Sequence, residues 1–269
     1  MQDARYTYYG DGAFFHARAD RIMGTRYDMI AAGLDDGTAR TLWEKVKTFL
    51  TEGDGIFNRF SPDSEVSGVN RLLAEGRKAP LGETLREEIA RCLDYQRRTG
   101  GLFNITRDAA SGIWLEDGQL CSKDTSANLD FGGYAKGWAL KGILGLLEDF
   151  GVHSAFIDFG GSSIYAMGDQ PSGEGWLVDL PSPFDGHTVT SYALRDEALS
   201  TSGNTPWYSG HIMNPFSGER EVSKALATVR CADPLDAEVL STVYMICNQS
   251  RRQEIERNFP EVKFEKFNL

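Results

Sequence analysis

The chain has 269 residues, of which 39 are acidic and 28 basic, giving a formal net charge of −11 at pH 7. An acidic surface argues against general nucleic-acid binding, and an anionic ligand would need positive groups gathered locally. Hydrophobic residues make up 41% of the chain, enough for a substantial core, but no run of about 18 apolar residues predicts a transmembrane segment.

The N-terminal residues 1–12 are mostly polar and lack the basic and apolar regions of a secretory signal peptide. As written, the sequence therefore predicts a cytoplasmic protein. A leader preceding it would instead place the protein in the periplasm or anchor it at a membrane.

Cysteine and histidine usage predicts neither a disulfide framework nor a zinc site. The four cysteines form no C-x-x-C pair, and none has a histidine at metal-binding spacing. We therefore expect them to be reduced and structural. The four histidines are scattered along the chain, which argues against a histidine-based metal site.

The first third of the chain contains one predicted strand and two predicted helices. Residues 25–33 are expected to form a strand, and apolar residues at helical spacing predict helices over 37–52 and 84–98. Thr84 and Glu87 have the spacing of a capping box at the start of the second helix.

The central part continues with a third helix over 137–150, with Gly151 as its stop. Residues 155–159 form a short apolar strand pattern. Residues 176–180 and 189–194 are expected to pair as two strands through an intervening turn.

The last part begins with a strand over 225–231, followed by an apolar and therefore buried helix over 235–247. A helix over 252–258 and an edge strand over 262–264 complete the pattern. Because strands and helices mix without strict βαβ alternation, the sequence predicts a single α+β or mixed α/β domain.

The segment before the third helix is a candidate ligand site. Asp130, the pair Gly132–Gly133 and Lys136 fall within seven residues. Glycine lets a ligand approach the backbone, and a helix N-terminus with a nearby lysine suits phosphate. The segment predicts a phosphate or dinucleotide site, although no G-x-G-x-x-G opens a helix after a strand and no G-x-x-x-x-G-K-[ST] occurs. An ordinary strand–turn–helix connection is the alternative.

Four further segments combine small or polar residues with Gly or Pro beside a strand pattern, the composition of turns. They are residues 23–25, 101–106, 201–204 and 211–215. A lone histidine next to a turn, such as His211, is more often a surface or hydrogen-bonded structural residue than a catalytic base.

Glu238 and Thr242 are four residues apart on a predicted helix and therefore share one face. A carboxylate beside a hydroxyl can hold a hard cation such as Mg²⁺, which prefers oxygen ligands. The alternative is a solvated Glu238 and a Thr242 that hydrogen-bonds to its own helix.

Taken in order, these segments resemble the ApbE family, the FAD:protein FMN transferases. The resemblance implies one compact, T-fold-related α+β domain over residues 1–269. It also implies Mg²⁺-dependent chemistry, in which the FAD pyrophosphate is split, FMN passes to a Thr hydroxyl of an acceptor flavoprotein, and AMP is released. The matching pieces are residues 23–25, 60–67 with Asn70, 101–106, 130–137, 160–161, 201–203, 211–215 with Gly218, and 237–242.

The resemblance also implies roles for individual residues. His211 would be the general base that takes a proton from the attacking Thr. Gly133, through its carbonyl, would hold Mg²⁺ together with Glu238 and Thr242. The residues expected to line the FAD site are Met23, Phe60, Leu102, Phe103, Asn104, Asp130, Lys136 and Ile212.

Several positions depart from the residues usual in the family. Glu238 and Asn104 stand where the family has Asp, Ser162 where an acid often follows the glycine pair, Lys141 where the family has Asp, and Phe60 where a Tyr is common. Three alternatives therefore stay open. An FAD pyrophosphatase would pass FMN to water, a non-catalytic relative would bind FAD indifferently to Mg²⁺, and an unrelated domain would match by coincidence.

Overall fold

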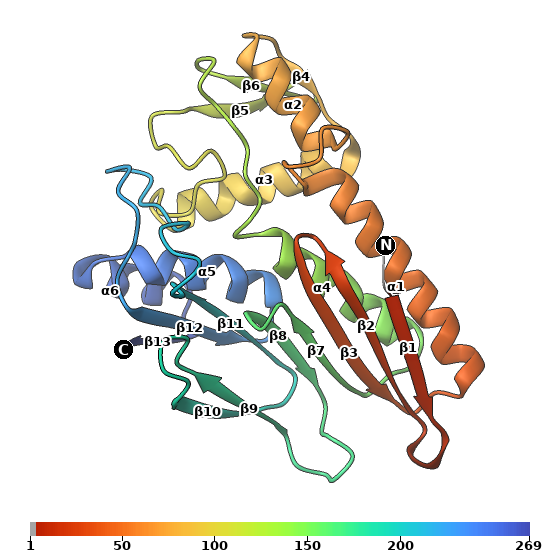
Figure 1. Cartoon of the computed structure of the whole chain (residues 1–269). Coiled ribbons are helices and arrows are strands. Elements are labelled where there is room, and N and C mark those ends of the chain that lie inside the picture. The colour runs from red at the N-terminus through yellow and green to blue at the C-terminus, as the bar shows by residue number, and fades with distance from the viewer. Residues whose placement is uncertain (1–3) are drawn as a thin grey trace.

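An eight-stranded antiparallel sheet runs through the molecule, in the order β1-β2-β3-β7-β8-β11-β12-β13 (Figure 1). The computed structural model describes residues 4–269, so the first three residues of the segment considered for a signal peptide lie outside it. The strands of this sheet are β1 (Ala4–Tyr9), β2 (Phe14–Ile22), β3 (Thr25–Ala32), β7 (Ser154–Phe159), β8 (Ser163–Met167), β11 (Glu197–Gly203), β12 (Ala225–Cys231) and β13 (Lys263–Asn268).

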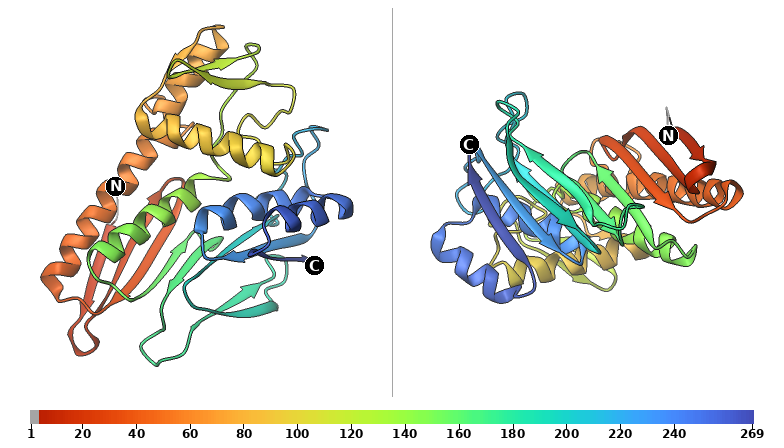
Figure 2. Two further views of the ribbon diagram at one scale, coloured as in Figure 1. Left: turned by 180° about the vertical axis from the view of Figure 1, so that it is seen from behind. Right: turned by 90° about the horizontal axis from the view of Figure 1, so that it is seen from below.

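Four helices cover one face of this sheet (Figure 2). They are α1 (Asp36–Phe57), α4 (Ala135–Asp149), α5 (Pro234–Ile246) and α6 (Gln249–Asn258). On the other face, the antiparallel hairpin of β9 (Trp176–Pro181) and β10 (Thr188–Leu194) packs a second apolar cluster against β8, β11 and β12. The hairpin is the one that the sequence predicted.

A smaller part lies beyond one end of the large sheet (Figure 1). It consists of α2 (Glu65–Ala74), α3 (Glu83–Arg98) and a three-stranded sheet of β4 (Ala79–Pro80), β5 (Ile113–Glu116) and β6 (Gln119–Ser122). One hydrophobic core joins the two parts, because it includes Leu73 of α2, Ile89 of α3 and Ile157 of β7. The mixed α+β class is confirmed, whereas the single-domain span over 1–269 stays a prediction.

Two expectations from composition are met within residues 4–269. All four cysteines are free and buried, as expected of reduced structural thiols. In this part of the chain no helix has the length and apolarity needed to cross a membrane.

At two places the structure differs from the helix cap or turn that the sequence predicts. The capping box at Thr84 and Glu87 is wrong, because α3 already begins at Glu83 with Gly82 as its N-cap and no side-chain cap. The Gly82 N–H instead donates to Oε1 of Glu65, at 2.7 Å. The turn composition at 201–204 also misled, since residues 201–203 belong to β11, an interior strand of the large sheet.

Helix α4 is held close to both neighbouring helices by glycines. A Cβ built on Gly137 would lie 2.7 Å from Cβ of Glu238 and 2.8 Å from the carbonyl oxygen of Pro234, both on α5. On the other side, Gly53 of α1 lies under Trp138, whose ring stacks on Phe49 with centroids 4.7 Å apart. The start of α4 is therefore fixed against the start of α5 at backbone contact distance.

Replacing Gly137 by Ala should destabilise the protein by about 1–3 kcal/mol, because the added methyl overlaps the backbone of α5. Gly145, further along the same helix, has nothing within 4 Å of a built Cβ. Its replacement by Ala should therefore be neutral or stabilise by up to about 1 kcal/mol. Urea unfolding of both variants measures the difference. A Gly137→Ala protein as stable as the Gly145→Ala protein would contradict the close contact.

Candidate functional site

The segment leading into α4 is held in place from both sides. The side chain of Asn70 on α2 accepts a hydrogen bond from the Leu129 N–H at 2.7 Å and donates to the Leu129 carbonyl at 3.1 Å. Oδ1 of Asp130 accepts from the Gly132 N–H at 2.9 Å, which shapes the turn before the helix. The N-cap of α4, Tyr134, makes no side-chain cap. An uncapped helix start of this kind suits an anion, and the phosphate or dinucleotide site expected there stays a prediction.

Two arginines that the sequence analysis did not single out converge on Asp130. Nη1 of Arg107 donates to Oδ2 of Asp130 at 3.0 Å, and Nε of Arg59 lies 3.4 Å from the same oxygen as an ion pair. Nη2 of Arg107 also donates to the backbone carbonyl of His211, at 3.1 Å. One guanidinium thus connects the α4 segment to the segment that carries His211.

His211 is half-buried and its imidazole stacks on the ring of Tyr208, with centroids 4.2 Å apart and planes inclined by 20°. Its Nδ1 is buried and has no hydrogen-bond partner among residues 4–269. Burial, followed by the charges of Arg107 and Lys136, lowers the pKa of His211 below its ordinary value of 6.5. The imidazole is therefore neutral at pH 7 and able to accept a proton.

Glu238 is a buried carboxylate, with 3% of its surface exposed, so the solvated alternative is wrong. Its Oε2 accepts hydrogen bonds from Oγ of Ser163 on β8, at 2.5 Å, and from Oγ of Ser200 on β11, at 3.0 Å. Its Oε1 is paired with the ammonium of Lys136 at the start of α4. These partners offset the cost of keeping the charge out of water.

Thr242 lies one turn after Glu238 on the same face of α5. Its Oγ1 is 3.3 Å from Oγ of Ser202, and a Cβ built on Gly133 would lie 3.3 Å from the same Oγ1. The Thr242 hydroxyl therefore faces β11 and the turn before α4, which contains Gly133. It does not bond only to its own helix. Thr242 thus lies near Gly133 and one helical turn from Glu238, and the role of these three residues as metal ligands stays a prediction.

The donor set at this place has the right chemistry for a hard cation. A carboxylate, a hydroxyl and a backbone carbonyl are all oxygen ligands, which Mg²⁺ prefers. Within residues 4–269, no three or more His, Cys, Asp or Glu side chains cluster in a way that could hold a metal. A cation would thus depend on the mixed set around Glu238 and would meet Lys136 there.

The aromatic and apolar residues predicted to line the FAD site fall into two groups. Phe60 is 82% exposed, and the guanidinium of Arg59 lies 4.5 Å from its ring centroid, so the ring is linked to Asp130 through Arg59. Leu102, Phe103 and Ile212 are buried in the hydrophobic core. Their side chains pack the protein interior, and their role in lining the FAD site stays a prediction.

Asn104 and Met23 occupy turns. Oδ1 of Asn104 accepts from the backbone N–H and the hydroxyl of Thr106, at 2.9 and 2.7 Å, so its side chain shapes the turn that presents Arg107. Met23 lies in the β2–β3 turn with a positive φ of 47°. The next strand starts at Thr25, whose hydroxyl would lie 2.3 Å from a Cβ on Gly160. The β2–β3 turn therefore packs against the β7–β8 turn, just before Ser163.

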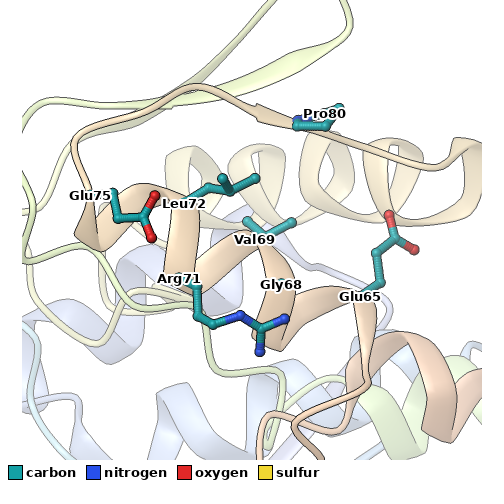
Figure 3. A pocket seen from close by; sticks show the side chains of 7 residues that line it. All are labelled: Glu65, Gly68, Val69, Arg71, Leu72, Glu75 and Pro80. Atoms are coloured by element: carbon teal, nitrogen blue, oxygen red, sulfur yellow. The ribbon is translucent and has the colours of Figure 1, made fainter.

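A hollow of about 430 Å³ lies elsewhere, on α2 and β4 (Figure 3). None of the predicted site residues lines it. Glu65 at its edge also anchors the start of α3, which gives this region a structural role. Its lining residues are Glu65, Gly68, Val69, Arg71, Leu72, Glu75 and Pro80.

Comparison with known proteins agrees with the predicted resemblance. A family model described as ApbE family matches residues 23–120 and 113–264. The chain is 21% identical to an FAD:protein FMN transferase of Klebsiella pneumoniae (strain 342), over 88% of the chain and 80% of that relative. It is 35% identical to an FAD:protein FMN transferase of Rhodobacter capsulatus, over 72% of the chain but 44% of that relative.

Solved structures show the same fold at lower sequence identity. The flavin transferase ApbE of Vibrio cholerae superposes with a TM-score of 0.79 at 18% identity, covering 98% of this chain and 97% of that one. The apbe protein of Thermotoga maritima gives the same TM-score and identity over 93% of both chains. The ApbE-like α+β fold expected from the sequence is thereby confirmed.

Replacing Arg107 by Met should raise the pKa of His211, because a nearby positive charge that opposes protonation of the imidazole is removed. NMR titration of the wild-type protein should place the His211 midpoint below 6.5, and the variant should titrate at higher pH. The resonance is assigned with a His211→Ala protein.

Arg220 provides the matched control for this titration. It donates to the carbonyl of Gly210 at 3.3 Å, next to His211, yet it is not among the charges that lower the His211 pKa. Replacing Arg220 by Met should leave the midpoint in place. Equal midpoints in the wild-type and Arg107→Met proteins would show that Arg107 does not act on the imidazole.

Proposed function

This chain belongs to the ApbE family, and from that membership we propose that it transfers FMN from FAD to a Thr hydroxyl of an acceptor protein and releases AMP. The match of the family model over residues 23–264 carries the proposal. It is supported by the relatives' shared description as FAD:protein FMN transferases. The contacts around Asp130, His211 and Glu238 support it further.

The FAD diphosphate is bound where cations outnumber carboxylates on an otherwise acidic protein. Arg59 and Arg107 pair with Asp130, Lys136 pairs with Glu238, and the uncapped start of α4 adds backbone N–H groups. This meets the requirement, evident from the net charge, that an anionic ligand needs local positive groups. Phe60, exposed beside Arg59, offers a ring face for the flavin or the adenine to stack on.

His211 takes the proton. The acceptor Thr oxygen attacks the phosphorus of the FMN half of FAD, and the P–O bond to the AMP half breaks. The hydroxyl proton goes to the imidazole, and AMP leaves with the bridging oxygen. The lowered pKa of His211 keeps the imidazole neutral, and thus basic, when the hydroxyl arrives.

The carbonyl of Gly133, the carboxylate of Glu238 and the hydroxyl of Thr242 would hold the Mg²⁺ that the family resemblance implies. The chemistry that Mg²⁺ supplies when bound is neutralisation of the charge on the phosphate oxygens. The protein's own contribution is a carboxylate fixed by Ser163 and Ser200, which cannot turn away from the site.

The surroundings of His211 favour a protein acceptor over water. Trp207, Tyr208 and Phe216 are large apolar side chains that stay exposed in the segment around the imidazole, at 81%, 61% and 58%. Exposed aromatic residues that gather beside a reactive group are typical of surfaces that contact another macromolecule. An enzyme that hydrolyses FAD has no need of such a surface.

The deciding experiment incubates the purified protein with FAD, with and without Mg²⁺, and with a Thr-bearing acceptor peptide. Chromatography follows AMP, free FMN and flavinylated peptide. Mg²⁺-dependent AMP together with FMN on the peptide supports the transferase. AMP with free FMN alone indicates an FAD pyrophosphatase, and intact FAD that stays bound in every tube indicates a non-catalytic relative.

Replacing His211 by Ala should lower the rate of FMN transfer by about 100-fold or more, the usual contribution of a general base, while FAD affinity changes only a few-fold. Added imidazole should restore part of the rate. His187, exposed in the β9–β10 turn, supplies the control, and its replacement by Ala should leave transfer unchanged. Undiminished transfer by the His211→Ala protein would remove His211 from the mechanism.

A further inference from the structure

We propose that Lys136 and a divalent cation compete for the carboxylate of Glu238, so that the cation binds well only after the FAD diphosphate has drawn the Lys136 ammonium away. The inference rests on the proposed function for the identity of the ligand. It gives Lys136, already part of the proposed diphosphate site, a second role in setting the order in which FAD and metal enter.

The two oxygens of Glu238 are held in different ways. Oε2 accepts from Ser163 and Ser200, which lie on adjacent interior strands and are 1% and 3% exposed. Oε1 is paired with Lys136, whose side chain is 21% exposed. A lysine has a flexible four-carbon stem, whereas a serine on an interior strand has a fixed position. Lys136 is therefore the partner that can leave.

Charge makes the competition strong. With Lys136 in place, the buried carboxylate is already neutralised, so a divalent cation would add two positive charges beside an ammonium at a site with little water. Like charges at such a site repel strongly. The FAD diphosphate supplies the negative charge that allows both cations to stay, since Lys136 can then pair with a phosphate oxygen.

Lys141 offers a matched comparison on the same helix. It pairs with Asp233 at the start of α5, so it also joins α4 to α5, but it does not contact Glu238. Both members of that pair are more exposed than Lys136 and Glu238, at 46% and 34% against 21% and 4% for the side chains. A change at Lys141 thus tests the loss of one helix-to-helix ion pair without freeing the buried carboxylate.

The experiment titrates the flavin-free protein with Mn²⁺ and follows free Mn²⁺ by electron paramagnetic resonance. Lys136→Met should bind Mn²⁺ about tenfold or more tightly than the wild type, and Lys141→Met should not differ from it. Adding FAD should tighten Mn²⁺ binding to the wild type by a similar factor and to Lys136→Met by much less. Adding Glu238→Gln to Lys136→Met should abolish the gain.

A second variant guards against a folding failure, because an unpaired buried carboxylate is destabilising. Lys136→Gln keeps a hydrogen-bond donor for Glu238 and removes the charge, so it should show the same tighter Mn²⁺ binding. Circular dichroism confirms that each variant is folded. Mn²⁺ affinity that is equal to or weaker than wild type in the folded Lys136 variants would overturn the proposal.

The same preparations separate this inference from the proposed function. If the wild type transfers FMN but the Lys136 variants bind Mn²⁺ with wild-type affinity, the proposed transferase function stands and the proposed competition at Glu238 is wrong. If the Lys136 variants bind Mn²⁺ more tightly but the wild type transfers no FMN, the proposed competition at Glu238 stands and the proposed transferase function is wrong.

Discussion

The buried carboxylate of Glu238 is the constraint on which the arrangement of the site depends. A buried charge needs hydrogen bonds and ion pairs to offset its loss of hydration. For Glu238 these come from β8, β11 and α4. The close approach of α4 to α5 at Gly137 brings Lys136 within reach of the carboxylate. The serines on the sheet fix its other side. Fold and site are thus joined through a single side chain.

A second set of contacts joins the two parts of the molecule around Asp130. Asn70 on α2 holds the backbone just before it, and Arg107 connects it to the carbonyl of His211. The backbone N–H of Ala109 also donates to the Pro215 carbonyl at 2.9 Å, which ties the two loops together. Groups more than 100 residues apart in the chain are therefore placed by loops that hold each other.

Periodic patterns predicted the long helices α1, α3, α4 and α5 and the β9–β10 hairpin, whereas β1, β2 and α2 were not predicted. The short elements around the site were not readable in this way. Ser200 and its neighbours in β11 are small and polar because they surround a buried carboxylate, so they have the composition of a turn. Arg107 carried no signal, since its importance comes from a left-handed backbone, with φ of 60°, that aims it at Asp130. Family resemblance located Glu238, but only tertiary packing shows that Lys136 already occupies its carboxylate.

The segment that carries His211 connects β11 to β12, two strands that pair directly in the sheet. Its ends are therefore fixed by the strand pairing, while the exposed Trp207 and Tyr208 lie between them. Substitutions or insertions there change an exposed surface, while the pairing of β11 with β12 keeps the register of the sheet. If the proposed function holds, this connection is the place to re-engineer the target of flavinylation, provided that His211 itself is kept.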